Sequence, residues 1–311
     1  MNRKRPLDVL VAGDLFLDLI MSGFESWPRP GEESIAKKFH KEVGGGAAIT
    51  ACGLAKLGTK TGILGIVGKE DGQWMLDQLR ARGVDTSRIQ VTSAEPTAFS
   101  VSVSTAQDRT FLTYNGANRG LLTLLGDLIG IASDCQVRHI HLAHAMDLAN
   151  LQASFKAIKD NGWSLSVDVG WHPEWYGDEH AIAALKLVDV FFPNEREAAA
   201  VTQETEPRRM LDAFQRMGLH RVALKLGKNG AALLWDGNVS MQKPGTIASV
   251  DTTGAGDCFD AGFLYAWLGG MEPALCLKAG AACGEMSTRA MGGIAGFPSK
   301  EELETILCAA K

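Results

Sequence analysis

The chain lacks any long uninterrupted apolar run, although 46% of its 311 residues are hydrophobic. A membrane-spanning helix needs about 20 consecutive apolar residues, and the first apolar run, Val9–Ala12, is broken by Gly13 and Asp14. The basic residues at positions 1–5 are followed by no apolar segment of the length that a secretory signal needs. We therefore expect neither a membrane span nor a cleaved leader.

An excess of positive charge is also missing. The 36 acidic residues outnumber the 31 lysines and arginines, which gives a formal net charge of −5. The basic residues are scattered along the chain, so they predict no broad positive field for a nucleic acid or an anionic membrane. A small molecule is the expected partner.

The cysteines lack the spacing of a structural framework. There are six, none of them in a CxxC pair and with irregular separations. Disulfides and zinc sites have more regular spacing, so we expect reduced thiols and a cytoplasmic protein. Internal repeats and low-complexity linkers are absent too, which favours one domain over residues 1–311.

What the chain does contain is an alternation of short apolar runs with segments of helical period. This rhythm predicts an α/β fold with a doubly wound, mostly parallel sheet and helices on both faces. The expected strands are Leu7–Ala12, Thr61–Val67, Val137–Leu142, Ser164–Val169, Val188–Phe192 and Arg221–Leu226. The expected helices include Ala47–Leu57, Gly72–Arg82, Ala255–Leu268, Glu272–Thr288 and Lys300–Ala310.

Two stretches break the rhythm, at residues 15–40 and 97–115. Leu15–Ser22 with Ser34–His40, and Thr97–Thr105 with Thr110–Tyr114, read as strands with no helix between them. We expect them to form a small separate sheet over one end of the main sheet. Edge strands of the main sheet are the alternative.

The densest chemistry lies at Asp251–Asp257, a turn of small residues that leads into a helix. Free N–H groups at a helix N-terminus bind anions, and glycines let the backbone approach a phosphate closely. The string fits neither a Walker A loop nor the GxGxxG dinucleotide motif. A capping function for Asp257 is the structural alternative.

A second polar group, Pro193–Glu197, follows the expected strand Val188–Phe192. In parallel α/β sheets ligands bind at the carboxyl ends of the strands. The amide oxygen of Asn194 and the carboxylate of Glu197 suit a hydrated Mg²⁺ near phosphates. The same pair also fits an N-terminal capping box, and both interpretations can hold together.

Taken together, these motifs resemble the PfkB (ribokinase-like) family of carbohydrate and nucleoside kinases. The matching residues are Gly44-Gly45, Asn194 with Glu197, Gly227 with Gly230, and the string from Asp251 to Gly262. Their order fits the family along nearly the whole chain. The resemblance implies a doubly wound α/β domain with a β-lid from about residues 15–40 and 97–115. It also implies ATP-dependent phosphoryl transfer to a hydroxymethyl group of a sugar or nucleoside.

The resemblance assigns roles to individual residues. Asp257 would be the base that accepts the proton of the attacking hydroxyl, and Gly254, Ala255 and Gly256 would form the anion hole. The nucleotide-side residues would be Asn194, Lys225, Gly227, Gly230, Thr252 and Cys283, and the substrate-side residues would be Asp18, Gly44, Gly45 and Asp168. Asn194 and Glu197 would hold Mg²⁺ through water. Asp251 and Thr253 lie on the loop where many relatives bind a monovalent cation, so K⁺ is a further candidate.

The acceptor side departs from the sugar kinases. Ile49 stands where ribokinase has an asparagine, Phe16 replaces a polar residue, and Gly170 and His172 replace an asparagine and an arginine. An apolar side chain cannot hydrogen-bond a sugar hydroxyl. The region Tyr114–Asn118 lacks the arginine typical of ketodeoxygluconate kinases, which makes an acidic sugar less favoured.

The aromatic residues Phe16 and Trp171 suggest stacking on a ring, with ordinary packing as the alternative. That stacking would favour a nucleoside, or a sugar with an apolar substituent.

A different class of function stays open: a non-catalytic sugar or nucleoside sensor that keeps the kinase fold. An oxidoreductase is disfavoured because the dinucleotide fingerprint is absent. Because an isolated small sheet is marginally stable, and lids of this family often pair between subunits, we expect a homodimer through the lid.

Overall fold

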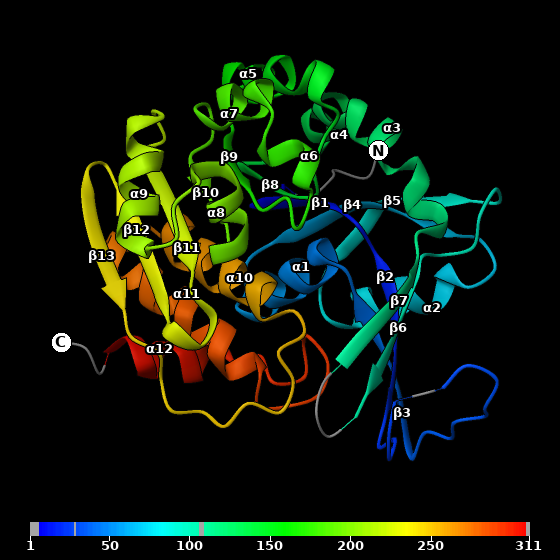
Figure 1. Cartoon of the computed structure of the whole chain (residues 1–311). Coiled ribbons are helices and arrows are strands. Elements are labelled where there is room, and N and C mark those ends of the chain that lie inside the picture. The colour runs from blue at the N-terminus through cyan, green and yellow to red at the C-terminus, as the bar shows by residue number, and fades with distance from the viewer. Residues whose placement is uncertain (1–5, 28, 106–108, 309–311) are drawn as a thin grey trace.

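The computed structural model describes residues 6–27, 29–105 and 109–308 (Figure 1). Within these ranges nine strands form one sheet in the order β13-β12-β11-β10-β9-β8-β1-β4-β5. Their bounds are β1 Val9–Gly13, β4 Thr61–Gly68, β5 Asp85–Thr92, β8 His139–Ala143, β9 Ser164–Val167, β10 Val190–Phe191, β11 Arg221–Lys225, β12 Ala231–Trp235 and β13 Asn238–Gln242. All the pairings are parallel except those of β12, which is antiparallel to both neighbours.

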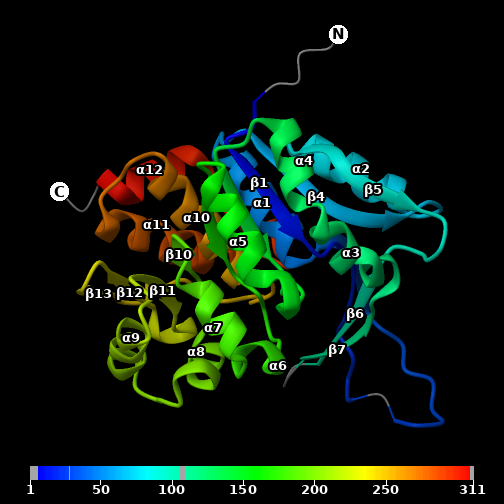
Figure 2. The ribbon, with the colours of Figure 1, turned by 90° about the horizontal axis from the view of Figure 1, so that it is seen from above.

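Helices cover both faces of this sheet (Figure 2). Alternate residues of β1 divide between two cores, because successive side chains of a strand point to opposite faces. Val9 and Val11 pack with one core and Leu10 and Ala12 with the other. The first face carries α1 Gly46–Lys56, α2 Gly72–Ala81, α10 Ala255–Leu268, α11 Pro273–Ser287 and α12 Lys300–Cys308. The second carries α3 Leu121–Gly126, α4 Leu128–Cys135, α5 Leu151–Asp160, α6 Pro173–Tyr176, α7 Glu179–Leu185, α8 Glu195–Thr202 and α9 Pro207–Arg216.

A second, four-stranded sheet is built from the two irregular stretches, as predicted. Its strands are β2 Phe16–Ser22, β3 Lys38–Gly44, β6 Phe99–Ser104 and β7 Arg109–Tyr114, in the order β3-β2-β6-β7. We call it the small sheet; Figure 1 shows it beside the main body, below β1 and β4. The alternative of edge strands on the main sheet is wrong, because these four strands pair only with one another.

The position of β3 differs from the expected Ser34–His40. The strand lies four residues later, because all seven residues of β2 pair with Lys38–Gly44. This register brings the chain directly from Gly44 into α1 and leaves Ile35 78% exposed. Pairing with β2, not the preceding Pro30-Gly31 turn, therefore decides where β3 lies.

Four further strands were not expected or are shorter than expected. β5 carries mostly polar residues with an exposed edge, so it has no apolar run. The β12–β13 hairpin turns at Asp236-Gly237, both with positive φ, which is typical of the tight type I′ turn. β10 has two residues rather than five. The expected turn at Gln107-Asp108 and the expected helix end at Ala310 lie outside the described residues.

Among the described helices, none combines the length and the apolar character that crossing a bilayer requires. All six cysteines are free thiols, and five of them are buried.

Candidate active site

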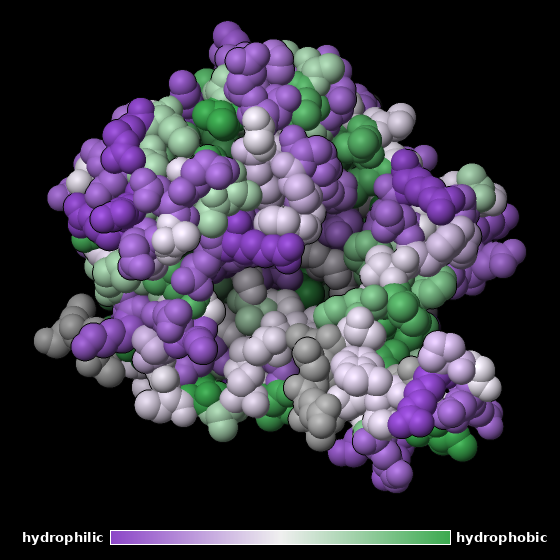
Figure 3. Space-filling view, viewed as in Figure 1, coloured by the Kyte–Doolittle hydropathy of each residue, from purple (hydrophilic) through white to green (hydrophobic). Residues whose placement is uncertain are grey.

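A cavity of about 490 Å³ lies between the carboxyl ends of β1, β8 and β9, Phe16 at the start of β2, and the segment that follows β7. Figure 3 shows the surface hollowed between the main body and the small sheet. The residues that line it are Asp14, Phe16, Gly46, Asn115, Asn118, Arg119, Leu122, Ala143, His144, Asp168, Val169, Gly170, Trp171, His172 and Asp257. This is the sheet edge where the parallel topology predicts a ligand.

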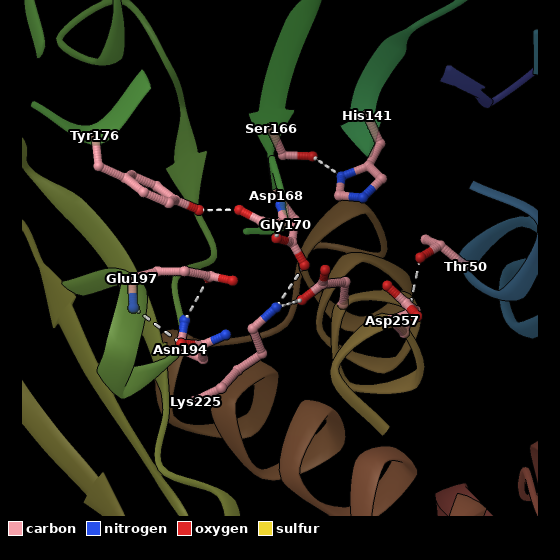
Figure 4. Close-up of polar contacts among 11 residues, drawn as sticks. Thr50, His141, Ser166, Asp168, Gly170, Tyr176, Asn194, Glu197, Lys225 and Asp257 are labelled. Atoms are coloured by element: carbon pink, nitrogen blue, oxygen red, sulfur yellow. Dashed lines mark hydrogen bonds and ion pairs between the residues drawn. The ribbon is translucent and has the colours of Figure 1, made fainter. Parts of the chain in front are cut away.

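Asp257 lies in the first turn of α10 and lines the cavity. Its main-chain oxygen accepts a hydrogen bond from Thr50 Oγ1 at 3.2 Å, which ties α10 to α1 (Figure 4). Its Oδ1 lies 3.1 Å from the position of a Cβ atom at Gly46. Burial, followed by the nearby carboxylate of Asp168, raises the pKa of Asp257 to about 7. A carboxylate with that pKa suits proton exchange near neutral pH.

The turn before α10 is shaped by Gly254 and Asp251. Gly254 has a left-handed backbone with φ of 69°, and a Cβ atom there would lie 2.7 Å from Ile49 Cδ1. Asp251 Oδ1 accepts hydrogen bonds from the N–H and the hydroxyl of Thr253, and its Oδ2 accepts one from Gly292 N at 2.9 Å. The carboxylate therefore closes the turn and joins it to the loop after α11.

Lys225 ends β11 and lies at the centre of a carboxylate cluster (Figure 4). Its Nζ is 2.6 Å from Asp168 Oδ2 and 3.4 Å from Asp260 Oδ1. Burial alone would lower the pKa of Lys225, but Asp168 and Asp260 raise it, so the ammonium keeps its charge. Although burial acts to raise the pKa of Asp168, Lys225 holds it below its usual range.

Asn194 and Glu197 form the capping box at the start of α8. Asn194 Oδ1 accepts from Glu197 N at 3.0 Å, and Glu197 Oε2 accepts from Asn194 N at 2.9 Å. Burial and the charge of Asp168 raise the pKa of Glu197 to about 7. The capping box expected from the sequence is thus present. It fixes the oxygen-bearing side chains of Asn194 and Glu197 beside Lys225, whose backbone pairs with that of Asn194.

This donor set fits a hydrated Mg²⁺. The buried carboxylate of Glu197 has two oxygens, and only one of them is used by the cap. A divalent cation would favour its ionised form, and amide and carboxylate oxygens are the ligands that Mg²⁺ takes. Asp168, Asp257 and Asp260 also bring carboxylate oxygens within 4.8 Å of one another, but the ammonium of Lys225 already lies among them.

The remaining nucleotide-side residues differ in how they are placed. Gly227 and Gly230 shape the tight turn between β11 and β12, with φ of 52° and 92°, and Thr252 lies in the turn before α10. The side chain of Cys283 is fully buried between α11 and α10, with Sγ 2.6 Å from a Cβ position at Gly262. Close helix packing leaves this thiol without exposed surface.

Three of the predicted substrate residues meet at the small sheet. The carboxylate of Asp18 fills the space beside Gly44, since a Cβ atom there would lie 2.1 Å from Asp18 Oδ2. Gly45 has φ of 93°, and its Cβ position is 2.5 Å from Asp14 O. Only glycine fits either position. The side chain of Asp18 follows Phe16 on the same face of β2, although the 490 Å³ cavity is lined by Phe16 and not by Asp18.

Several aromatic rings line one part of the cavity. Phe16 and Trp171 both line it, together with His144 and His172, whose rings are 5.1 Å apart. Arg196 stacks on Trp171 at 3.8 Å. Burial, with a smaller effect of His172, lowers the pKa of His144 to about 4, so the imidazole is neutral.

Ile49, one of the departures from the sugar kinases, does not line the cavity. Its Cδ1 lies 2.6 Å from a Cβ position at Gly293 and 2.7 Å from the one at Gly254. The residue is buried in the core of α1 and α10. It therefore packs against the turn rather than facing an acceptor.

Sequence reasoning missed two carboxyl groups at this site. Asp14 follows β1, lines the cavity and accepts a hydrogen bond from Gly46 N at 3.1 Å, and burial raises its pKa to about 6. Asp260 lies one helical turn after Asp257 and is fully buried. The position of Asp14 directly after the first strand could have indicated that it lies at the ligand-binding edge of the sheet. The spacing of three residues from Asp257 could have indicated that Asp260 lies on the same side of the helix.

Comparison with known proteins identifies the family of this chain. The family model described as pfkB family carbohydrate kinase matches residues 7–300. The 2-dehydro-3-deoxygluconokinase of Bacillus subtilis is 29% identical, covering 87% of this chain and 88% of that protein. The ribokinase of Haemophilus influenzae is 25% identical, covering 94% and 95%. The solved structure of Arabidopsis thaliana ribokinase complexed with ribose and ATP is similar at a TM-score of 0.84 and 26% identity, covering 97% and 99%. The chain therefore belongs to the pfkB family of carbohydrate kinases.

Proposed function

We propose that this pfkB-family kinase transfers the γ-phosphoryl group of ATP to a hydroxymethyl group of a sugar or nucleoside. One observation carries the proposal: Asp257 faces the cavity from the first turn of α10, directly after the glycine turn. A base and an anion-binding helix start are thus combined on one segment.

In the proposed reaction the acceptor hydroxyl oxygen attacks the γ-phosphorus as the bond to the bridging β,γ oxygen breaks. Asp257 accepts the hydroxyl proton, and ADP leaves. The N–H groups at Gly254, Ala255 and Gly256 stabilise charge on the transferring group. Mg²⁺ bound with the nucleotide would neutralise the phosphates, and Asn194 and Glu197 would hold it through water. Lys225, Gly227, Gly230 and Thr252 would contact the nucleotide.

The lining of the cavity supports a cyclic acceptor. Asp18 and Asp168 would bind its hydroxyl groups, with the backbone of Gly44 and Gly45 close to it. Phe16, Trp171 and the neutral ring of His144 offer flat apolar faces beside hydrogen-bonding nitrogens. Ribokinase, fructokinase and 2-dehydro-3-deoxygluconokinase occur among the relatives, which supports a sugar or sugar-like ring.

The test is a panel of sugars, sugar acids and nucleosides with Mg-ATP, read as ADP formation and as phosphorylated product. We expect turnover of at least one acceptor. Thermal unfolding with a non-hydrolysable ATP analogue and Mg²⁺ identifies binders independently, because a ligand of the folded state stabilises it by mass action. Panel members that bind without ever being phosphorylated would contradict the kinase proposal and favour the sensor.

We further propose that residues 1–311 are one cytoplasmic kinase domain that forms a homodimer through the small sheet. Apolar side chains exposed there support the dimer: Phe39 is 64% exposed and Leu112 is 62% exposed.

The turn at Asp251 and Thr253 is our proposed K⁺ loop. A rate that is independent of K⁺ at constant ionic strength would contradict that part.

A further inference from the structure

Asp260 is a carboxyl group whose burial needs an explanation. It has no exposed surface, and its Oδ2 has no hydrogen-bond donor within the described ranges. A buried polar atom without a partner costs about 1–3 kcal/mol, and an apolar residue at this position of α10 would avoid that cost. The fold alone gives no reason for an aspartate here.

The surroundings of Oδ2 indicate that it carries a proton. Burial, with Asp168 and Asp257 close by, raises the pKa of Asp260 well above its usual value. One ammonium, Lys225, is shared between two carboxyl groups, and it is closer to Asp168 than to Asp260. Asp168 keeps the negative charge, and a protonated Oδ2 of Asp260 becomes a donor toward Asp168. The missing partner is thereby explained.

Lys225 lies beside the start of α10. Its Nζ is 3.5 Å from the position that a Cβ atom would take at Gly256, in the turn that opens α10. Two contacts, Asp168 Oδ2 and Asp260 Oδ1, hold the ammonium there. Figure 4 shows Lys225 directed at Asp168, with Asp257 on the far side of the cluster.

We propose that Asp260 is a positioning residue that holds the Lys225 ammonium against the start of α10, where the ammonium stabilises negative charge on the transferring phosphoryl group. This inference rests on the proposed function. A fixed cation beside the anion hole acts most strongly in the transition state, when the charge spreads over the phosphoryl oxygens. A lysine left unrestrained would pair with Asp168 alone and could turn away.

The test is a double-mutant cycle with Lys225→Met and Asp260→Leu, measured as steady-state transfer from Mg-ATP to the best acceptor of the panel. Lys225→Met should lower kcat about 100-fold and change the acceptor KM by less than about 3-fold. Asp260→Leu should lower kcat about 10- to 100-fold. If Asp260 acts through Lys225, the double variant should be no slower than Lys225→Met alone.

Asp260→Asn separates positioning from packing. Asparagine keeps the Oδ1 acceptor and the neutral state, so it should recover at least about 5-fold of the rate lost in Asp260→Leu. Should Asp260→Leu fail to fold, Asp260→Ser takes its place in the cycle. The control is the ion pair of Lys159 with Asp189, whose Nζ and Oδ2 are 2.5 Å apart in another part of the molecule. Asp189→Asn should lower the unfolding temperature and leave kcat unchanged.

Two results would overturn the inference while leaving the kinase intact: an Asp260→Leu variant as fast as the active wild type, or single effects that multiply in the double variant. A wild type that phosphorylates no acceptor would instead remove the proposed function and this inference with it.

Discussion

At the scale of single residues, the site is a group of carboxyl groups held in an environment that disfavours their charge. Asp257 and Asp14 are both raised in pKa by burial, and each lies beside Gly46. Enzymes pay for such groups in stability because the reaction needs them. The glycine at 46 is small enough to let both carboxyl groups approach.

Replacing Asp257 by asparagine should separate activity from stability. The base is lost, so kcat should fall by about 10²- to 10⁴-fold. The pKa of Asp257 is raised in the folded state, so this group lowers stability as the pH rises from about 4 to about 7, and the ionised carboxylate remains unfavourable above that. At pH 8 the variant should therefore unfold about 2–4 °C higher than the wild type. Asp77→Asn, on the exposed side of α2, is the control. An Asp257→Asn variant that is both active and less stable than the wild type would contradict the assignment of Asp257 as the base.

The pH dependence of kcat/KM should report the same group. Asp257 must be ionised to accept a proton, so the rate should rise with pH and level off above a midpoint near 7. The titratable groups that face it are Asp14 after β1, Asp168 after β9, Glu197 on α8, Lys225 on β11 and Asp260 on its own helix. Lys225→Met removes the favourable charge and should move the midpoint to higher pH. A profile that stays flat between pH 5.5 and 8.5 would show that Asp257 is not the base.

At the scale of elements, the proposed anion site depends on how α10 begins. Gly254 takes a left-handed conformation, and its space is bounded by Ile49 on α1 and by Gly293 in the loop after α11. The helix start is therefore set by three segments that are far apart in the sequence. The same contact explains why Ile49 is apolar, because its side chain packs against this turn.

Gly254→Ala should cost both stability and rate. A non-glycine residue in the left-handed region costs about 1–2 kcal/mol, and the added Cβ would lie 2.7 Å from Ile49 Cδ1. Gly270→Ala is a matched control, because Gly270 has φ of 77° and no atom near its Cβ position. We expect Gly254→Ala to unfold at a lower temperature than Gly270→Ala and to lose kcat, which Gly270→Ala keeps. Adding Ile49→Val to Gly254→Ala should restore part of the loss. If Gly254→Ala and Gly270→Ala instead have equal unfolding temperatures and equal kcat, the contact with Ile49 is unimportant.

At the scale of the whole molecule, side-chain contacts join the small sheet to the main body. One of them is the ion pair of Arg82, which follows α2, with Glu42 on β3, whose Nη2 and Oε1 atoms are 2.8 Å apart. Apolar residues of the small sheet are exposed in the single chain. We propose that a second copy of the chain buries them. The sheet would then gain in the dimer the support that four strands alone supply weakly.

Phe39→Glu and Leu112→Glu should each weaken the dimer. A charge placed at an apolar contact is costly to bury, so light scattering at micromolar protein should shift from twice the chain mass toward the chain mass. Met241→Glu, an exposed apolar position on β13 in the main sheet, is the control and should leave the mass unchanged. A wild type that already has the mass of one chain would contradict the proposed dimer.

Much of the fold, with the start of α10 and the Asn-Glu cap of α8, could be predicted because these signals are local. The helix Ala255–Leu268 was predicted at the observed bounds, since its glycine turn and apolar face are adjacent in sequence. The capping box at Asn194 and Glu197 lies within four residues. β3, by contrast, was misplaced by four residues because its position depends on pairing with β2.

The sequence by itself determined a doubly wound α/β kinase fold with a glycine turn, an Asn-Glu pair and an aspartate in the first turn of a helix. Only the tertiary structure decided which side chains meet. Lys225, Asp168 and Asp260 come from β11, from the end of β9 and from α10, and Asp14, after β1, lines the same cavity as Asp168. Strand order and helix docking create these contacts, and no local pattern encodes them, because the free energy of burying a charged group depends on neighbours that are distant in the chain.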